Sequence, residues 1–490
     1  MLYERFRAVV ESYKNSSKYV KASVWFALCM FLQKGIGTIT TPVFTRLMST
    51  DEYGQFCVFC SWLGIATVFV TLNLYFGVFT SGLIRYEHDR DRFSSSMHGL
   101  LTFMVCVWGI VYCIGFEFWN ELLSLSTEEM IMMFLLIWSA SVFQLWGARQ
   151  RALFNYKKLV VITLIVSVAT SILGVCLVSI ADDKVLARIV GMVAGSFFVY
   201  AWVFSSDVVR GKCVFSAYYW KYAIFMAVPL IPHYLSAVIL VSADRIMIAK
   251  MISESAAGIY SLGYSVSQVM TIANTAILQA LEPWIYKNIK DRKFGDIENI
   301  AYRAFVFIAL LNVIFIAFAP EAVALFAPQD YYDAIWVIPP VAMSIYFTFL
   351  YGFFASYEFY FKKTYFISIA TVIGAVVNIG LNYICLERFG YYAAGYTTLL
   401  CYIIFACMHY VFMNRVCHKY LSNIKPYNGK KIIAITSVFL IVGGVFLLTY
   451  ENFLFRYGLI TMLMVIIFYK RVAIKNNFHS ILSIKKAGIN

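Results

Sequence analysis

Long apolar runs alternate with short polar segments along almost the whole of this chain of 490 residues. A helix needs about 20 apolar residues to cross the hydrocarbon core of a bilayer, and the runs are close to or above that length. The pattern therefore predicts an all-α polytopic membrane protein with about fourteen transmembrane helices. The expected spans are 23–47, 54–82, 97–118, 130–147, 159–180, 185–204, 222–247, 256–283, 301–327, 335–361, 364–386, 392–413, 431–449 and 453–469.

The composition favours a bilayer environment over a soluble fold. Hydrophobic residues make up 61% of the chain and charged residues only 13%, against about 25% charged residues in an average soluble domain. A soluble core stops growing beyond roughly 300 residues, so it could not hide this much apolar surface. The segments between the runs are short, which argues against an enzyme whose chemistry lies in a large extracytoplasmic loop.

The net charge of +14 reflects membrane topology rather than nucleic-acid binding, because of where the charged residues lie. When the predicted spans are followed in order, 32 of the 40 Lys and Arg residues fall on the side of the N-terminus, 7 fall on the opposite side, and Lys34 lies within a span. Cytoplasmic loops carry such an excess of Lys and Arg. We therefore expect both termini in the cytoplasm, and we expect no binding of nucleic acid.

An internal repeat relates two parts of the chain. When the sequence is shifted by 204 residues, RLMSTDEYGQFCVFCS (46–61) lies over KMISESAAGIYSLGYS (250–265) without gaps. Both segments form an outer turn after an odd-numbered span, and a shift of six spans preserves orientation, which predicts parallel repeats. The identical positions are Ser49 and Ser253, Gly54 and Gly258, and Ser61 and Ser265.

The repeat defines four expected parts of the chain. A cytoplasmic N-terminal segment, 1–22, is polar and basic and does not have the pattern of a signal peptide. Two six-helix halves follow at 23–210 and 211–420, and transporters built in this way place the substrate path between the halves. Two extra helices and a cytoplasmic tail occupy 421–490.

Polar side chains recur at helical spacing within several spans. Each such stripe by itself is also what helix packing would produce, because small polar residues favour close helix contacts. Spans 1, 2, 7 and 8 are equivalent under the repeat, however, and a shared water-filled cavity explains all four. Pro229 and Pro232 are expected to break span 7 near that cavity. Candidate substrate-binding residues in the stripes are Thr38, Asn73, His233, Gln268, Thr271, Gln279, Asn378 and Asn382.

Lys34 is the most specific candidate for a binding residue, because it is a basic residue in the middle of span 1. Insertion scales assign roughly 2.5–3.5 kcal/mol to a basic residue at the centre of a transmembrane helix. A cation in a cavity suits an anionic ligand. The alternative of equal weight is an ion pair with a buried acid, either Asp244 or Glu358.

Other charged residues lie toward the ends of the predicted spans. Asp244 and Arg245 are adjacent at the outer end of span 7, where they either form a gate or end the helix in solvent. Arg85, Arg149 and Glu282 lie near the cytoplasmic ends. For each of these three residues an anchoring role at the interface is favoured over ligand binding.

The sequence carries no recognisable catalytic chemistry. The motifs GxxxxGK[ST], GxSxG and HExxH are absent. Most of the eleven cysteines lie in apolar runs, where Cys packs as a small hydrophobe. Cys57 and Cys60 have CxxC spacing but no second pair and no nearby His. We therefore expect a transporter without a metal or cofactor, rather than an enzyme.

Three segments resemble bacterial polysaccharide repeat-unit flippases of the O-antigen type. They are TPVFTRLMSTDEYGQFCVF (41–59), FGVFTSGLIRYEHDRDRF (76–93) and ADRIMIAKMISESAAGIYSLGYSVSQV (243–269), and the last is the strongest match. The length, the span count and the two six-span halves are similar too. The resemblance covers most of the chain and weakens after about residue 430.

This resemblance implies the fold of the multidrug/oligosaccharidyl-lipid/polysaccharide exporter superfamily. It implies a flippase that moves an undecaprenyl-diphosphate-linked oligosaccharide from the cytoplasmic to the outer leaflet of the bacterial cytoplasmic (inner) membrane, by alternating access. Membrane lipid and other polysaccharide assembly proteins, such as those of lipopolysaccharide, are the implied partners. On this interpretation Lys34 attracts the diphosphate or an acidic sugar, and Arg85 and Arg149 draw the headgroup from the cytoplasm. Hydrogen bonds to sugar hydroxyls are expected from Gln268, Asn378 and Asn382.

Coupling to H+ or Na+ would use an acid within the membrane, either Asp244 or Glu358. Two other functions are alternatives. A multidrug or cation exporter of the same superfamily usually needs an acid in the cavity of the N-terminal half, whereas spans 1 and 2 offer Lys34 and no acid. A membrane polysaccharide polymerase or ligase should have a long outer loop with Arg or His, and the sequence has none.

Overall fold

The computed structural model describes residues 18–422 and 424–471, which form helices and connecting turns without a β-strand. Residues 1–17, 423 and 472–490 lie outside the described part. Most of the expected N-terminal segment 1–22 and of the expected cytoplasmic tail therefore lies outside it as well. The chain divides into two compact units, Met1–Met48 with Val58–Leu235, and Ser49–Cys57 with Ser236–Asn490.

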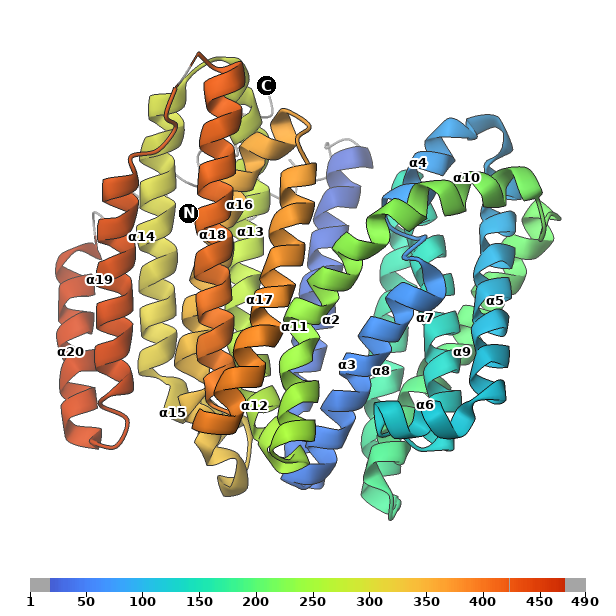
Figure 1. Ribbon diagram of the computed structural model, residues 1–490, viewed down its shortest axis with the longest axis horizontal. Helices are drawn as coiled ribbons and strands as arrows, with labels where there is room; N and C mark the ends of the chain where they lie inside the picture. The colour runs from blue at the N-terminus through green and yellow to red at the C-terminus, as the bar shows by residue number, and fades with distance from the viewer. Residues whose placement is uncertain (1–17, 423, 472–490) are drawn as a thin grey trace, which may run out of the picture. The chain divides into compact units, whose positions relative to one another are not determined.

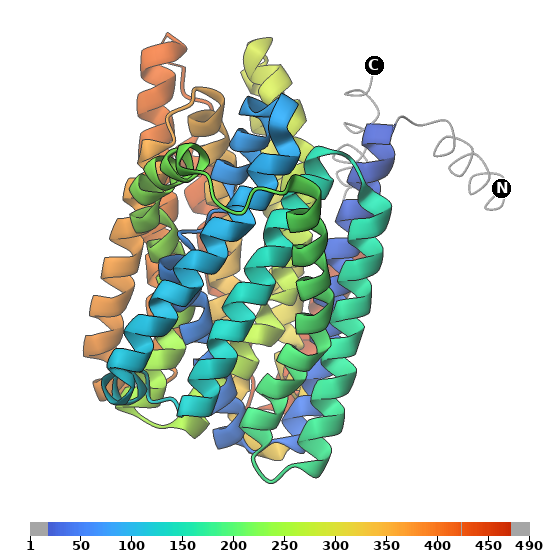
Figure 2. The ribbon, with the colours of Figure 1, turned by 90° about the vertical axis from the view of Figure 1, so that its right-hand side faces the viewer.

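In the first unit, α8 packs against α2 and α9, while α5 and α7 pack against α9. Figure 2 shows these helices running alongside one another. The elements from the start of the described chain to the boundary of the units are α2 (Lys18–Leu47), α3 (Thr50–Thr71), α4 (Gly77–Arg85), η1 (Glu87–Asp89), α5 (Arg90–Ile114), α6 (Phe116–Leu123), α7 (Thr127–Ala152), α8 (Tyr156–Ile180), α9 (Lys184–Gly211), α10 (Ala217–Ala227), η2 (Val228–Leu230) and α11 (Ile231–Met251).

In the second unit, α16 is the central helix, because 89% of its apolar window is buried and it packs against α13, α14 and α18. Helices α19 and α20 lie beside α14 (Figure 1). The elements after α11 are α12 (Glu254–Ser267), α13 (Val269–Lys290), α14 (Phe294–Ala317), α15 (Ala319–Phe326), η3 (Gln329–Trp336), α16 (Ile338–Tyr360), α17 (Tyr365–Phe389), α18 (Ala393–Tyr420), α19 (Gly429–Leu447) and α20 (Phe453–Tyr469).

The prediction of an all-α polytopic membrane fold is confirmed. Within the described residues, 11 helices are long and apolar enough to cross a membrane. The other three expected spans are also helical but are not among these 11. They are α2, the eighth span, which is divided between α12 and α13, and α20, which has 17 residues.

The second expected span, 54–82, is not one continuous helix, and this part of the prediction is wrong. Helix α3 ends at Thr71, and both Leu72 and Asn73 have positive φ angles, of 50° and 49°. A left-handed pair cannot continue the right-handed hydrogen-bond ladder. The Asn73 N–H donates to Thr71 Oγ1 at 3.2 Å instead, and α4 begins only at Gly77.

The expected break in span 7 is confirmed. A 3₁₀ turn, η2, separates α10 from α11 and contains Pro229, which has no N–H to donate to the preceding turn. The eighth span is also interrupted, because α12 ends at Ser267 and α13 begins at Val269. This interruption at Gln268 was not expected from the sequence.

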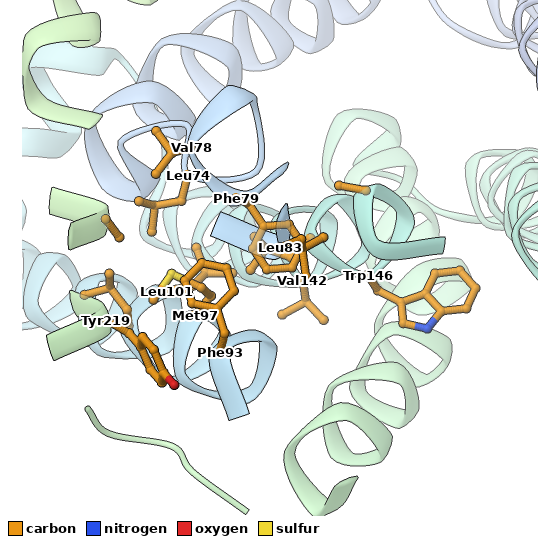
Figure 3. Packing of buried hydrophobic residues seen from close by; sticks show 14 of the residues in the cluster. Leu74, Val78, Phe79, Leu83, Phe93, Met97, Leu101, Val142, Trp146 and Tyr219 are labelled. Atoms are coloured by element: carbon orange, nitrogen blue, oxygen red, sulfur yellow. The ribbon is translucent and has the colours of Figure 1, made fainter. Parts of the chain in front are cut away.

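After the break in span 2, α4 packs against its neighbours through an apolar cluster (Figure 3). The rings of Phe79 and Phe93 stack with their centroids 5.7 Å apart. A Cβ atom at Gly82 would overlap the Phe93 ring, so this close approach requires glycine. The labelled members of the cluster come from α4, α5, α7 and α10 and the turn before α4, namely Leu74, Val78, Phe79, Leu83, Phe93, Met97, Leu101, Val142, Trp146 and Tyr219.

The repeated serines begin equivalent helices. Ser49 precedes α3, where its Oγ accepts the Glu52 N–H at 3.2 Å and its own N–H donates to the Glu52 carboxylate at 2.7 Å. This reciprocal arrangement is a capping box. Ser253 precedes α12, and its Oγ accepts the Ala256 N–H at 3.1 Å. The identity of Ser49 and Ser253 in the repeat therefore satisfies backbone donors at two helix starts.

The repeated glycines lie where these two helix starts meet, within the second unit. A Cβ atom at Gly54 would overlap the backbone carbonyl of Glu254, and one at Gly258 would overlap that of Thr50. Next to this contact the hydroxyl of Ser255 donates to Thr50 Oγ1 at 2.7 Å. The two glycines thus permit a backbone contact that any larger residue would obstruct.

Candidate functional site

The second unit holds a buried carboxylate, that of Asp244 on α11, which is 1% exposed. Its Oδ2 accepts hydrogen bonds from the hydroxyls of Tyr260 at 2.6 Å and Thr398 at 2.7 Å. Its Oδ1 accepts a hydrogen bond from Asn382 Nδ2 at 2.6 Å. Side chains from α12, α17 and α18 therefore converge on one carboxylate and occupy three of its acceptor positions.

Two more polar groups extend this arrangement. Asn382 Nδ2 lies 3.4 Å from Asn378 Oδ1, and the Thr397 hydroxyl donates to Asn382 Oδ1. Asn378 is fully buried, yet its Nδ2 has no hydrogen-bond partner among the described residues. We call the six residues the Asp244 cluster, which consists of Asp244, Tyr260, Asn378, Asn382, Thr397 and Thr398.

The Asp244 cluster offers oxygen donors of three kinds: carboxylate, amide and hydroxyl. Hard cations take oxygen ligands of these kinds. A transition-metal site is a poorer fit, since no three His, Cys, Asp or Glu side chains of residues 18–422 and 424–471 gather around one point. The cluster can therefore hold a proton or a small hard cation.

A second buried acid pairs with a histidine. Glu358 on α16 and His409 on α18 are both 0% exposed, and Glu358 Oε1 lies 2.8 Å from His409 Nδ1. The Tyr351 ring stacks on the imidazole, with 5.3 Å between centroids. Within the described chain, neither Glu358 Oε2 nor His409 Nε2 has a hydrogen-bond partner. This arrangement allows the carboxylate and the imidazole to share a proton.

The first unit contains a buried ion network around Arg149 of α7, which is 2% exposed. Arg149 Nη1 lies 3.4 Å from Asp207 Oδ1 on α9, and its Nη2 pairs with Asp91 on α5. Asp207 Oδ2 is 3.2 Å from His98 Nε2, and Asp91 Oδ2 is 3.0 Å from Arg210 Nε. The Arg149 side chain is therefore held in one position between two acids.

The predicted cavity residues of spans 1 and 2 differ in their surroundings. Lys34 is exposed on α2, and its backbone carbonyl accepts the Thr38 hydroxyl at 2.9 Å. Asn73 is 4% exposed at the break after α3, so its side chain is not free to meet a ligand in this state. Arg85 is exposed at the end of α4, and its guanidinium lies over the Tyr222 ring, 5.3 Å from the centroid.

The predicted residues of span 8 do not join the Asp244 cluster through any hydrogen bond found in the described chain. Gln268 lies between α12 and α13. Its backbone carbonyl oxygen accepts a hydrogen bond from the Thr271 hydroxyl at 2.6 Å. Gln279 is exposed on α13. The Glu282 carboxylate accepts the Tyr286 hydroxyl at 2.5 Å, one turn further along the same helix. These residues line one helix rather than meeting at one site.

The remaining two predicted site residues, Arg245 and His233, lie on α11. The Arg245 guanidinium covers the Tyr264 ring, 4.5 Å from its centroid, and Nη1 donates to the Val241 carbonyl at 3.1 Å. It therefore contacts neighbours within its own unit rather than ending the helix in solvent. His233 is partly exposed near the start of α11, and its Nδ1 has no hydrogen-bond partner in the described part of the chain.

Several residues of these sites were missed from the sequence. Thr397 and Thr398 form a polar pair in the apolar run 392–413, and His409 is an isolated titratable group in the same run. Both the threonine pair and the isolated histidine could have been recognised in the sequence as candidate site residues. Asp207 and His98 offered no comparable signal, because neither stands out from the charged and polar residues near a span end.

Comparison with known proteins supports the resemblance seen in the sequence. The model of the family described as "Polysaccharide biosynthesis protein" matches residues 19–289. A protein of Haemophilus influenzae, "Lsg locus putative protein 1", is 26% identical over 212 residues, which are 40% of this chain and 51% of that protein. The match therefore spans about half the length of that relative.

Solved structures share the fold at low sequence identity. "Lipid II flippase MurJ" in an inward closed conformation has a TM-score of 0.66 and 16% identity, with 92% of this chain and 100% of that chain covered. An inward-facing "multidrug resistance MATE family transporter of the MOP superfamily" has a TM-score of 0.61 and 14% identity, with 82% and 100% covered. The family match covers more than half of the chain, and the chain therefore belongs to the family described as "Polysaccharide biosynthesis protein", as a multi-pass membrane protein whose fold is similar to that of these solved structures.

Proposed function

We propose that this protein is a flippase that moves an undecaprenyl-diphosphate-linked oligosaccharide from the cytoplasmic to the outer leaflet of the bacterial inner membrane. Its family membership and its fold, shared with a protein described as a lipid II flippase, support this function. The substrate combines an anionic diphosphate, a polar sugar head and a lipid tail. The two six-helix halves would alternate access to it while both termini stay in the cytoplasm.

The observation that carries the proposal is the environment of Lys34. The residue lies about 24 Å from the start of α2 at the helical rise of 1.5 Å per residue, near the middle of the helix. It is exposed, and it makes no ion pair with any residue of the described chain. Asp244 and Glu358, the two acids that offered an alternative explanation, have hydrogen-bond partners in their own unit. Lys34 is therefore available to an anionic substrate.

Translocation of a fluorescent polyprenyl-diphosphate oligosaccharide in reconstituted vesicles tests this role. We expect Lys34→Gln to lower transport efficiency roughly tenfold or more, because a hydrogen bond to a charged group contributes about 1.5–3 kcal/mol. Lys34→Arg should retain most of the activity, since it preserves the positive charge. Lys290→Gln, at an exposed lysine at the end of α13, is the matched control and should transport at the wild-type rate.

The same vesicles distinguish the main alternative. If Lys34→Gln transports normally, the cationic role is wrong. If the wild type moves no polyprenyl-linked glycan but exports cationic dyes, the protein is a multidrug exporter, a function found on the same fold.

We further propose that transport is coupled to Na+ or H+ at the Asp244 cluster. The cluster combines one carboxylate with amide and hydroxyl oxygens, and hard cations take oxygen ligands of these kinds. A bound cation would neutralise the carboxylate and would change its hydrogen bonds to Tyr260, Asn382 and Thr398. Because these partners lie on three other helices, ion binding would alter how the helices pack.

Transport rates in vesicles with imposed gradients test the coupling site. A Na+ gradient at fixed pH, or a pH gradient at fixed Na+, should accelerate the wild type. Asp244→Asn should abolish the acceleration, because the amide carries no charge for the cation to neutralise. Glu358→Gln, the control at the other buried acid, should keep the acceleration. A wild type indifferent to both gradients, or a gradient response lost only in Glu358→Gln, would rule out coupling at Asp244.

A further inference from the structure

A cavity in the first unit lies outside the Asp244 cluster and has no role so far. It has a volume of 440 Å³ and lies among α7, α8 and α9, at the ends of α7 and α9 that carry Arg149 and Arg210. These three helices run side by side in the first unit (Figure 2). Its charged and polar lining consists of Arg149, Gln150, Asn155, Lys157, Lys158, Ser206, Asp207 and Arg210.

The positive charge of this cavity is only partly compensated. Asp207, the one acid in the lining, pairs with Arg149, and Asp91 pairs with both Arg149 and Arg210. Lys157 and Lys158, by contrast, are exposed and form no ion pair with a residue in 18–422 or 424–471. Four cations thus face two carboxylates, and the two lysines supply the excess.

The wall of the cavity is apolar on its other side. Trp146 and Trp202 line it together with Val161 and Ile162. Trp202 and Val161 are 63% and 54% exposed on the outside of a transmembrane unit, where lipid is the expected neighbour. Tryptophan is enriched at the level of lipid headgroups, so this wall suits a molecule with an apolar tail beside its charge.

We propose that this cavity binds the phosphate group of an anionic membrane phospholipid. Lys157 and Lys158 bind the phosphate, Arg149 provides a fixed cation at the floor, and Trp202 contacts the first segment of the acyl chains. The arrangement has both parts of a lipid site, since basic pockets between transmembrane helices recognise anionic headgroups. Arg149, which the sequence suggested as a contact of the transported headgroup, would on this proposal face a resident phospholipid instead.

Lipid titration of the purified full-length protein tests the site. Native mass spectrometry in detergent would measure binding of phosphatidylglycerol, phosphatidylcholine and inorganic phosphate to wild type and variants. We expect Lys157→Gln/Lys158→Gln to weaken phosphatidylglycerol binding on the order of tenfold, since each basic residue contributes substantially to attraction of anionic lipid. Lys362→Gln/Lys363→Gln, an adjacent lysine pair between α16 and α17, is the matched control and should bind like wild type.

A thermal-unfolding measurement separates loss of the site from loss of the fold. Both double variants should unfold at the wild-type Tm in phosphatidylcholine, and only the cavity variant should lose the Tm increase that phosphatidylglycerol gives. Equal phosphatidylglycerol affinity in both variants would overturn the proposal. Displacement of the lipid by millimolar phosphate, or by an undecaprenyl diphosphate at lower concentration than phosphatidylglycerol, would overturn the assignment to a resident phospholipid.

Discussion

At the scale of single residues, the two buried acids of the second unit have different chemistry. Both oxygens of the Asp244 carboxylate accept hydrogen bonds, from three donors in all. Glu358 has one partner, His409, and its second oxygen has none in the described chain. A buried pair that loses one partner leaves the other polar group unsatisfied. We therefore expect Glu358 and His409 to contribute to stability, whereas our proposal places ion coupling at Asp244.

Removal of one or both members of the Glu358 pair tests this division. Glu358→Met alone leaves His409 buried without its partner and should lower the free energy of unfolding by about 3 kcal/mol. The double variant Glu358→Met/His409→Leu replaces both by apolar groups and should recover most of that loss, with near-normal transport. Thermal unfolding and vesicle transport would be measured together. A double variant that is stable but inactive would move the coupling site to Glu358.

The Asp244 cluster shows that residue patterns predict which side chains share a face of one helix, but not which helices bring them together. The stripe in 364–386 predicted that Asn378 and Asn382 share one polar face, since they are four residues apart. Asp244 stood out as an acid in an apolar run. That the two meet depends on how α11, α17 and α18 pack, which spacing within one helix cannot specify. The sequence therefore identified Asp244, Asn378 and Asn382 as candidates without showing that they belong together, and it did not identify Thr397 and Thr398.

At the scale of elements, the repeat acquires a physical explanation. Ser49 and Ser253 begin equivalent helices, and Gly54 and Gly258 lie one turn further along, where the helix starts touch. Three identities in a 16-residue alignment are few, yet two of them lie where the structure needs a small or capping residue. The steric requirement accounts for Gly54 and Gly258 better than common ancestry alone.

Substitution of one repeat glycine tests this contact. Gly258→Ala should lower stability by roughly 1–3 kcal/mol, because its Cβ would overlap the Thr50 carbonyl and the backbone would have to shift. The control is Gly380→Ala on α17, where a Cβ would meet nothing within 4 Å and alanine favours the helix. Thermal unfolding of both variants would be compared with wild type. Equal stability of the two variants would show that the helix starts separate at little cost.

Breaks within spans show why hydropathy predicts helices better than it predicts their continuity. Pro229 predicted the break in span 7, where the structure has a 3₁₀ turn, because proline removes a backbone hydrogen-bond donor. The break at Leu72 and Asn73 contains no proline, and its one local sign is Asn73, a residue type that adopts a positive φ more readily than most. Leu74 and the residues of α4 then pack into the apolar cluster of the first unit.

At the scale of the whole molecule, run lengths and charge positions predicted most of the architecture. Each apolar run corresponds to helical structure, because backbone groups in a bilayer must bond within their own segment. The 32-to-7 distribution of Lys and Arg also indicates an orientation. Orientation is a property of the chain in a membrane, so it requires its own measurement.

Two exposed aspartates offer a matched test of orientation. Asp182 lies between α8 and α9, and Asp291 between α13 and α14, so three predicted spans separate them. An odd number of spans places them on opposite sides, and the charge distribution puts Asp182 outside. All eleven cysteines are free thiols and would first be replaced. In intact cells, a membrane-impermeant maleimide should label Asp182→Cys, whereas Asp291→Cys should react only after permeabilisation. The reverse order would invert the orientation and the proposed direction of transport, and labelling of both from outside would contradict the span count between them.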